Sequence, residues 1–252
     1  MRLALIGAVA LTIVGTAMVL SASTGRSVAS AGEPPRFVDE TTEAGVDHTY
    51  DGEFEFFVGG GVAAFDCDDD GRPDLFFAGG SEPAALYRNE SRVNGALSFA
   101  RLPSPVTDLT AVTGAYPIDL DGDGHVDLAV LRRGANVILR GRGACRFEDA
   151  TEQLGIDGGD EWTVAFSATW EGENAMPTLA FGNYLVADRS GCSDSVLLRP
   201  ASTGSGYAPS VPLSPGYCAL SMLFSDWSRT GRRDLRMSND RHYYRDGEGE
   251  RV

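Results

Sequence analysis

The chain has 252 residues, with 36 acidic and 21 basic side chains and a formal net charge of −15. So acidic a balance excludes nucleic acid as a partner, because binding to the phosphate backbone needs a positive surface. Apolar residues make up 42% of the sequence, which is ordinary for a globular protein with a core to bury.

An apolar run from Leu3 to Leu20 follows Met1-Arg2 and precedes small and polar residues that include Ala29-Ser30-Ala31. This order is typical of a secretory signal, and the run is also long enough to be an uncleaved anchor. We therefore predict a signal peptide or N-terminal anchor over 1–31, a linker over 32–36 and a folded region over 37–252. The protein should be secreted or periplasmic, with membrane contact only if the N-terminal segment is retained.

The densest acidic stretch begins at Asp66, where five carboxylates fall within nine residues. Its spacing, Asp-x-Asp-x-Asp-Gly-x-x-Asp, returns at Asp119, and an eroded copy begins at Asp226. Carboxylates this close repel one another unless a cation binds between them, and calcium prefers an all-oxygen ligand set. The sequence therefore predicts calcium-binding loops at 66–74 and 119–127, and a weak or empty loop at 226–234.

The predicted ligands are side-chain oxygens at loop positions 1, 3, 5 and 9 and the backbone carbonyl at position 7. They are Asp66, Asp68, Asp70, Arg72 and Asp74 in the first loop, Asp119, Asp121, Asp123, His125 and Asp127 in the second, and Asp226, Ser228, Thr230 and Asp234 in the eroded loop at 226–234, the fourth in the repeat described next. An EF-hand is excluded because its obligatory glutamate at position 12 is replaced by Phe77 or Val130.

The loops recur at a regular interval. They begin at residues 66, 119 and 226, so the first interval is 53 residues and the second, 107, is close to twice that. A silent third copy is therefore predicted at 170–179, which ends in a similar Leu-apolar-apolar-small pattern but lacks the aspartates. A fixed period of this size indicates a propeller or a solenoid.

Short apolar runs bounded by glycines flank the loops, at 60–65 and 75–78 for the first. Runs of this kind predict strands, so each loop should connect a β-hairpin. A second hairpin is predicted between 130–131 and 137–139, with 84–89 as the matching strand one unit earlier. Residues 36–46 are nearly repeated at 146–156, about two periods later.

Residues 187–215 are loop-like, with one strand candidate at 195–198. Long ordered excursions of this kind often form binding surfaces. No amphipathic helix of convincing length follows residue 32.

The four cysteines form no Cys-x-x-Cys pair, and an even number in an oxidising compartment predicts two disulfides. Cys192 and Cys218 bracket one irregular stretch and are predicted to pair, which leaves Cys67 with Cys145. Free, buried thiols are the alternative.

Catalysis has little support in the sequence. His48, His125 and His242 share no spacing that suggests a cluster, and no nucleophile elbow or phosphate-binding glycine loop occurs. Three tryptophans are predicted to fill the core between repeats rather than to form a sugar-stacking platform. They are Trp162, Trp170 and Trp227.

The acidic motif, preceded by Gly-Val-Ala-Ala-Phe at 61–65, resembles the FG-GAP or VCBS repeat of integrin-α-type β-propellers. The patterns at 37–39, 85–89, 181–184 and 215–218, and those at 224–227 and 238–241, are similar to the bacterial branch of the cartilage acidic protein 1 family. The resemblance covers nearly all of the chain after residue 36. It implies a secreted calcium-binding propeller and ligation by the aspartates of the first two loops. It transfers only partly to the fourth loop, and the chain has no room for the family's ASPIC/UnbV segment.

We therefore expect an all-β protein, a β-propeller of about four blades in a partial or open ring. Its expected function is non-catalytic binding or adhesion to an unknown extracellular protein or carbohydrate, with Ca²⁺ as the bound ion. A propeller-scaffolded hydrolase or lyase, or a truncated nonfunctional fragment, is the alternative.

Overall fold

The structure, a computed structural model, describes residues 36–239 and 250–251. The predicted signal or anchor over 1–31 lies outside the described residues, as does nearly all of the 32–36 linker. The chain divides into two compact units, 1–39 and 40–252. Everything below concerns the second unit unless stated.

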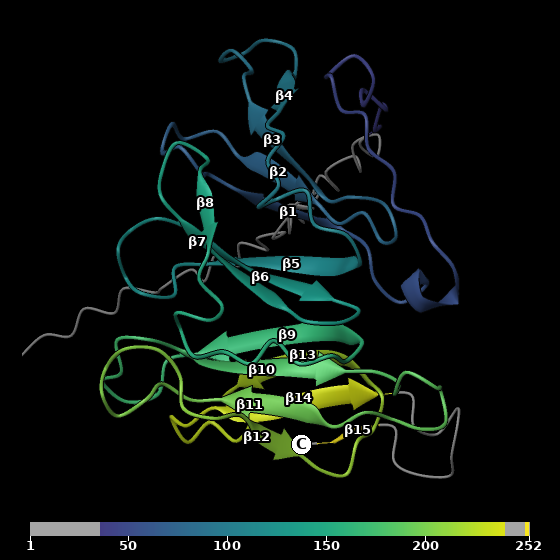
Figure 1. The fold of residues 1–252 in the computed structure, drawn as a ribbon. Helices are drawn as coiled ribbons and strands as arrows, with labels where there is room; N and C mark the ends of the chain where they lie inside the picture. The colour runs from purple at the N-terminus through teal and green to yellow at the C-terminus, as the bar shows by residue number, and fades with distance from the viewer. Residues whose placement is uncertain (1–35, 240–249, 252) are drawn as a thin grey trace, which may run out of the picture. The chain divides into compact units, whose positions relative to one another are not determined.

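The second unit is built from four antiparallel sheets in which strands follow one another in chain order (Figure 1). The first sheet contains β1 (Val62–Phe65), β2 (Asp74–Phe77), β3 (Ala85–Asn89) and β4 (Phe99–Arg101). The second contains β5 (Val112–Ile118), β6 (Asp127–Arg132), β7 (Val137–Gly141) and β8 (Phe147–Asp149). The third contains β9 (Thr163–Thr169), β10 (Thr178–Asn183), β11 (Ser195–Leu198) and β12 (Val211–Leu213). The fourth contains β13 (Ala219–Ser225), β14 (Asp234–Asn239) and β15 (Glu250–Arg251).

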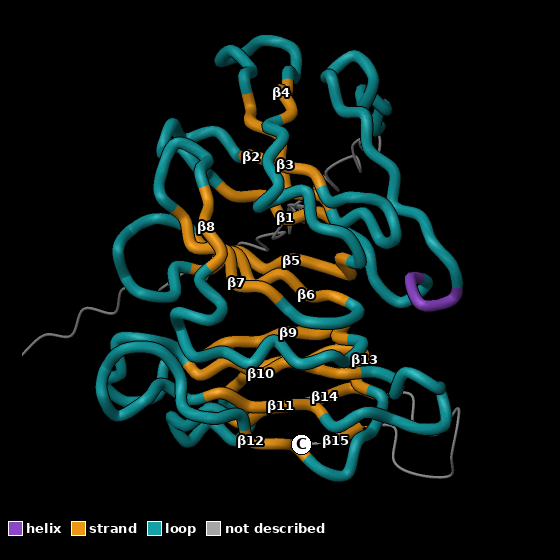
Figure 2. Tube along the Cα trace, in the orientation of Figure 1, coloured by secondary structure: helices purple, strands orange, loops and turns teal. Residues whose placement is uncertain are grey.

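Helix is nearly absent from the part of the chain that the structure describes. One short 3-10 turn, η1 (Phe54–Phe56), precedes the first sheet, and the rest is strand and loop (Figure 2). The predicted all-β class is confirmed, as are the strand at 195–198 and the hairpin formed by β6 and β7.

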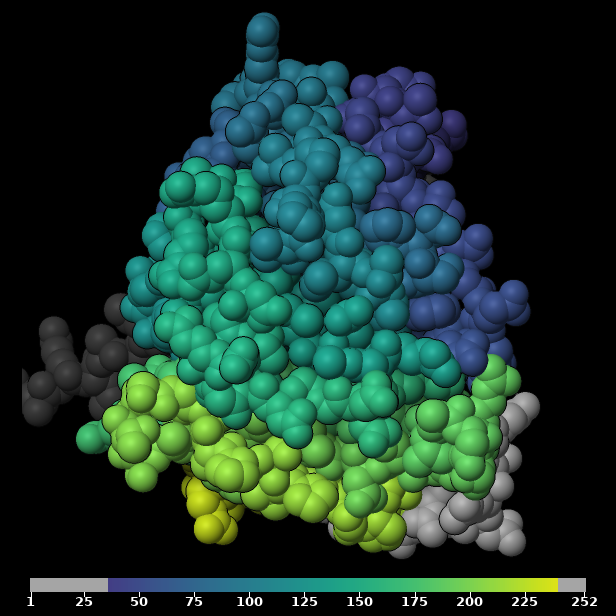
Figure 3. Space-filling model, in the orientation of Figure 1, coloured from purple at the N-terminus to yellow at the C-terminus, as the bar shows by residue number. Residues whose placement is uncertain are grey.

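Successive sheets pack face to face, and apolar residues from both partners fill each interface. Phe76, Leu86, Leu128 and Leu139 belong to the cluster between the first and second sheets. Leu131, Ile138, Leu179 and Phe181 lie between the second and third, and Ala180, Leu197, Met222 and Met237 between the third and fourth. In Figure 3 the segments of successive sheets follow one another across the viewed face.

The second strands of the two middle sheets, β6 and β10, are covered on both faces, which explains their largely apolar sequences. Every residue of β10 is buried, and only the last residue of β6 is partly exposed. In contrast, β1 alternates between exposed and buried residues because only one of its faces contacts the next sheet. Whether a strand is apolar throughout or alternates between apolar and polar residues therefore depends on whether one or both of its faces are covered by neighbouring sheets.

The first strands of successive sheets lie next to one another, β1 beside β5, β5 beside β9 and β9 beside β13. Between the strands of the fourth sheet and those of the first, the described residues form no packing of comparable extent. The observed architecture is thus four consecutive antiparallel sheets, and a closed ring is not observed in the described residues.

Both predicted disulfides are confirmed. Cys67–Cys145 joins the first loop to the segment between β7 and β8, and so links the first two sheets. Cys192–Cys218 joins the segment before β11 to the segment that enters β13. The described residues contain no free cysteine.

The prediction for the tryptophans is wrong for two of the three. Trp162 is buried and meets Tyr184 edge to face, whereas Trp170 and Trp227 are 50% and 65% exposed. Both exposed residues lie in loops between the first and second strands, outside the packed faces of the sheets. The Arg236 guanidinium lies 4.0 Å from the ring centroid of Trp227, a cation–π contact at the surface.

The repeated segment forms the same turn twice. Backbone hydrogen bonds from Ala44 to Glu40 and from Val46 to Thr41 recur as Leu154 to Ala150 and Ile156 to Thr151. The segments before the two turns differ, because 147–149 forms strand β8 on β7 whereas 37–39 forms no strand.

Candidate metal-binding loops

All four predicted loops occupy the same place in their sheets, between the first and second strands. The residue at position 9 is the first residue of the second strand and pairs with the last residue of the first strand. These closing pairs are Phe65 with Asp74, Ile118 with Asp127, Thr169 with Thr178, and Ser225 with Asp234. The prediction of hairpin loops repeated in phase is confirmed, including the silent third loop at 170–179.

The aspartate at position 1 holds the turn of its own loop. Asp66 accepts hydrogen bonds from the backbone N–H of Asp70 and Gly71, at 3.2 and 2.7 Å. Asp119 accepts from Gly122 and Gly124 at 2.8 and 3.1 Å, and Asp226 accepts from Thr230 and Gly231 at 2.8 Å each. Each loop is therefore preorganised by its first carboxylate.

The glycine at position 6 is required by backbone geometry. Gly71, Gly124 and Gly231 have φ angles of +81°, +87° and +82°, in the left-handed region that favours glycine. The shared conformation accounts for the glycine that all three aspartate-bearing loops carry.

The aspartate at position 9 is buried and joins the loop to the third strand. Asp74 accepts the N–H of Cys67 on one oxygen and that of Asn89 on the other, each at 2.8 Å. Asp127 does the same with Leu120 and Gly141, again at 2.8 Å. These two carboxylates are therefore structural acceptors in addition to predicted ligands.

Burial also sets the electrostatics of these residues. Burial raises the pKa of Asp127 to about 6, and the nearby Asp121 and Asp123 add to the rise while its two backbone hydrogen bonds oppose it. Burial likewise raises the pKa of Asp74.

Two loops bring three carboxylates together. Ligand oxygens of Asp66, Asp68 and Asp70 all lie within 4.8 Å of one another in the first loop. In the second loop the group consists of Asp119, Asp121 and Asp127. Asp74 and Asp123 lie outside these groups, so the structure assembles only part of each predicted ligand set.

The first loop fits a hard cation by an independent observation. One carboxylate oxygen of Asp68, Oδ1, is buried and has no hydrogen-bond partner among the described residues. Burial, with the charges of Asp70 and Asp66, raises the pKa of Asp68. An orphaned buried oxygen beside two further carboxylates is a donor set that a divalent cation satisfies.

The side chains at position 7 differ between the two loops. Arg72 stays on its own cluster, where it pairs with Asp70, and it donates from Nε to the carbonyl of Asn89 at 3.2 Å. His125 leaves its loop, and its Nδ1 lies 3.7 Å from Asp69 Oδ2 of the first loop. Ligation by the two carbonyls stays a prediction.

The other histidines are dispersed. His48 Nε2 hydrogen-bonds the carbonyl oxygen of Ala78 at 2.7 Å, and its ring packs on Phe77. His242 lies outside the described residues.

The third loop contains an ion pair in place of the aspartate cluster. Glu171 accepts a hydrogen bond from the Thr178 hydroxyl at 2.8 Å and contacts Arg199 Nε at 3.2 Å. Thr178 is fully buried at the position that Asp74 and Asp127 occupy in the first two loops. A guanidinium thus supplies the positive charge of this loop.

The fourth loop is held by its hydroxyls. Ser228 Oγ lies 3.1 Å from Thr230 Oγ1 and 3.4 Å from Asp234 Oδ2. Only two carboxylates remain, and three arginines, at 229, 232 and 233, lie in the same loop. The charge balance disfavours a cation here, in line with the predicted weak or empty site.

Three arginines near the loops were missed by reasoning from the acidic motif. Arg88, Arg140 and Arg199 each follow the third-strand residue that pairs with the leucine after position 9. In the sequence, each arginine directly follows a tyrosine or leucine near the end of the third strand, as Tyr87-Arg88, Leu139-Arg140 and Leu198-Arg199.

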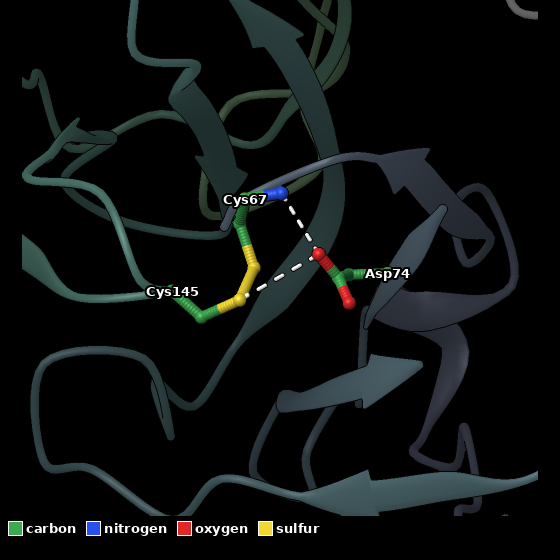
Figure 4. Close-up of side chains that lie close together, drawn as sticks. All are labelled: Cys67, Asp74 and Cys145. Carbon is green, nitrogen blue, oxygen red and sulfur yellow. Dashed lines mark hydrogen bonds between the residues drawn. A yellow bond between two sulfur atoms is a disulfide. The ribbon is translucent and has the colours of Figure 1, made fainter. Parts of the chain in front are cut away.

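Cys67 lies inside the first loop, between Asp66 and Asp68, and its disulfide touches the position-9 carboxylate (Figure 4). Asp74 Oδ2 lies 2.8 Å from the Cys67 nitrogen and 3.5 Å from Cys145 Sγ. Because both sulfurs are bonded to each other, this Cys-Asp-Cys group offers no thiolate to a metal. It fixes the base of the loop.

Comparison with known families agrees with this geometry. Residues 66–130 match the family model described as FG-GAP-like repeat. The matched region begins at the first loop and ends in the strand after the second, so it spans one full period. It supports the predicted repeat type, whereas the finer likeness to cartilage acidic protein 1 is not shown. A comparison with curated proteins found no match.

Among the described residues, no helix is long and apolar enough to cross a membrane.

Proposed function

We propose that the first two loops bind Ca²⁺ and that the ion holds the first and second strands of their sheets in register. The observation that carries this proposal is the buried, partnerless Oδ1 of Asp68, on a carboxylate that is grouped with those of Asp66 and Asp70, with ligand oxygens of the three residues within 4.8 Å of one another. Without a cation, this oxygen loses its hydration on folding and gains no partner, which is costly for a charged group.

The residues that would hold the ion are Asp66, Asp68 and Asp70 in the first loop and Asp119, Asp121 and Asp127 in the second. A bound Ca²⁺ supplies positive charge that cancels repulsion among these carboxylates. The position-1 aspartates hold the turn. The position-9 aspartates connect each loop to the third strand, because they accept hydrogen bonds from the backbone N–H groups of Asn89 and Gly141. The remaining predicted ligands, including the carbonyls of Arg72 and His125, would complete the coordination.

We further propose that the four sheets are blades of an open propeller related to the bacterial cartilage acidic protein 1 family. The supporting observations are the repeat match over 66–130, the four sheets in chain order and the recurrence of the opening segment. The two disulfides are consistent with an extracellular location. The resulting function is calcium-stabilised binding or adhesion to an extracellular protein or carbohydrate, without catalysis.

Titration calorimetry of the full chain with CaCl₂ tests the metal sites. The proposal predicts two bound ions, one of which is lost in Asp68→Asn and the other in Asp121→Asn. Ser228→Ala in the fourth loop is the matched control and should leave the stoichiometry at two. The absence of binding heat in the parent protein, with no calcium-dependent change in its circular dichroism melting, would refute the proposal.

A further inference from the structure

In the first two sheets, an arginine near the end of the third strand lies across from position 9 of the loop. Tyr87 pairs with Leu75 and Leu139 pairs with Leu128, so Arg88 and Arg140 follow at equivalent places in the first two sheets. The two loops have the same aspartate spacing, which makes them an internal comparison within one chain.

In the second sheet the arginine is already bonded to a predicted ligand. Arg140 Nε lies 3.0 Å from Asp121 Oδ2, and the Arg140 side chain is only 12% exposed. Arg140 Nη1 also contacts Gln153 at 3.4 Å, which fixes the guanidinium beside the loop. A contact this shielded from water is weakened little by salt.

In the first sheet the equivalent arginine pairs with a glutamate outside the loop instead of with a predicted ligand. Arg88 pairs with Glu90, and the two side chains are 42% and 45% exposed. Asp68, which occupies the same loop position as Asp121, is left with its buried Oδ1 lacking a partner among the described residues. The arginine that pairs with a clustered carboxylate in the first loop is Arg72, on Asp70, and its side chain is 40% exposed, so a cation can displace it more readily than the shielded Arg140 of the second loop.

We propose that Arg140 competes with the cation in the second loop, so that the first loop binds Ca²⁺ more tightly, and that Glu90 maintains this difference by holding Arg88 away. This inference rests on the proposed calcium binding and deepens it by ranking the two sites. A unit charge about 6 Å from a divalent ion disfavours binding by about tenfold even in a medium as polarisable as water.

The second loop is tested in an Asp68→Asn background, where calorimetry of the full chain with CaCl₂ reports that loop alone. Adding Arg140→Gln should lower the Kd by about tenfold. Arg101→Gln is the control, because it removes the same charge from β4, where Arg101 pairs with Asp108, and should leave the Kd within about twofold. An Arg140→Gln protein that binds calcium with an unchanged or higher Kd would overturn the inference.

The first loop provides a reciprocal test in an Asp121→Asn background. Glu90→Gln should release Arg88 toward Asp68 and raise the Kd severalfold, and adding Arg88→Gln should restore tight binding. A double variant as weak as the single one would overturn the inference. If neither background binds calcium, the proposed function fails and the inference with it, whereas two loops of equal Kd overturn the ranking alone.

Discussion

Asp74 and Asp127 are the residues on which each loop depends whether or not an ion is bound. Each is buried and accepts two backbone hydrogen bonds, one from its own loop and one from the third strand or its end. The acidic spacing predicts them as ligands, but nothing in the spacing distinguishes them from the exposed aspartates beside them. Their structural part depends on the third strand, which is distant in the sequence.

Asp74→Ala is expected to destabilise the calcium-free protein by about 2–4 kcal/mol, because two buried N–H groups lose their acceptor. Asp69→Asn, which removes the charge of an exposed carboxylate in the same loop and tolerates its backbone φ of +62°, should change the free energy of unfolding by less than about 0.5 kcal/mol. Urea unfolding measures both. If the two variants lost the same free energy of unfolding, Asp74 would have no special structural role.

The pKa of about 6 for Asp127 predicts a pH dependence in the calcium-free protein. The folded-state pKa lies above the ordinary value near 3.8, so the stabilising contribution is fully present below about pH 4 and is lost as the pH rises through 6. The loss should amount to roughly 2–3 kcal/mol. Urea unfolding between pH 4 and 7 should show it in the parent protein, and Asp127→Asn should be flatter across that window.

At the scale of elements, the strands that flank the loops were predictable because they are short apolar runs between glycines, and their burial follows from packing between sheets. The strand β12 was not predicted, because Val211–Leu213 is a short edge strand that contains Pro212 and has no buried residue. Residue type alone places Trp170 and Trp227 in the core, but both lie inside the predicted loops at 170–179 and 226–234, which leave their rings exposed to solvent. The arginines were missed because their place is set by cross-strand register.

The disulfides are expected to contribute unequally to stability. Their sequence separations are 78 residues for Cys67–Cys145 and 26 for Cys192–Cys218. In the chain-entropy description, removing them costs about 4.5 and about 3.5 kcal/mol respectively. Urea unfolding of the two double serine variants measures this difference. A larger loss for Cys192→Ser/Cys218→Ser would contradict the order.

At the scale of the whole molecule, four sheets follow one another and share three apolar interfaces, and loops of one type recur at the junction of their first two strands. The period of 53 residues allowed this repetition to be predicted, including the loop that has lost its aspartates. The expected propeller of about four blades in a partial or open ring stays a prediction, since blade number and ring closure depend on the angle between packed sheets, which a linear period does not encode.

Thermal unfolding of the full chain in calcium-free buffer and in millimolar calcium tests the central claim most directly. Each site contributes about 2.7 kcal/mol when free calcium is 100 times its Kd, and each kcal/mol raises the Tm of a protein of this size by about 2–4 °C. With both sites occupied to that extent, we predict an increase of about 10–20 °C that is reduced in Asp68→Asn and abolished in Asp68→Asn/Asp121→Asn. Superimposable melting curves of the parent protein in the two buffers would contradict the account.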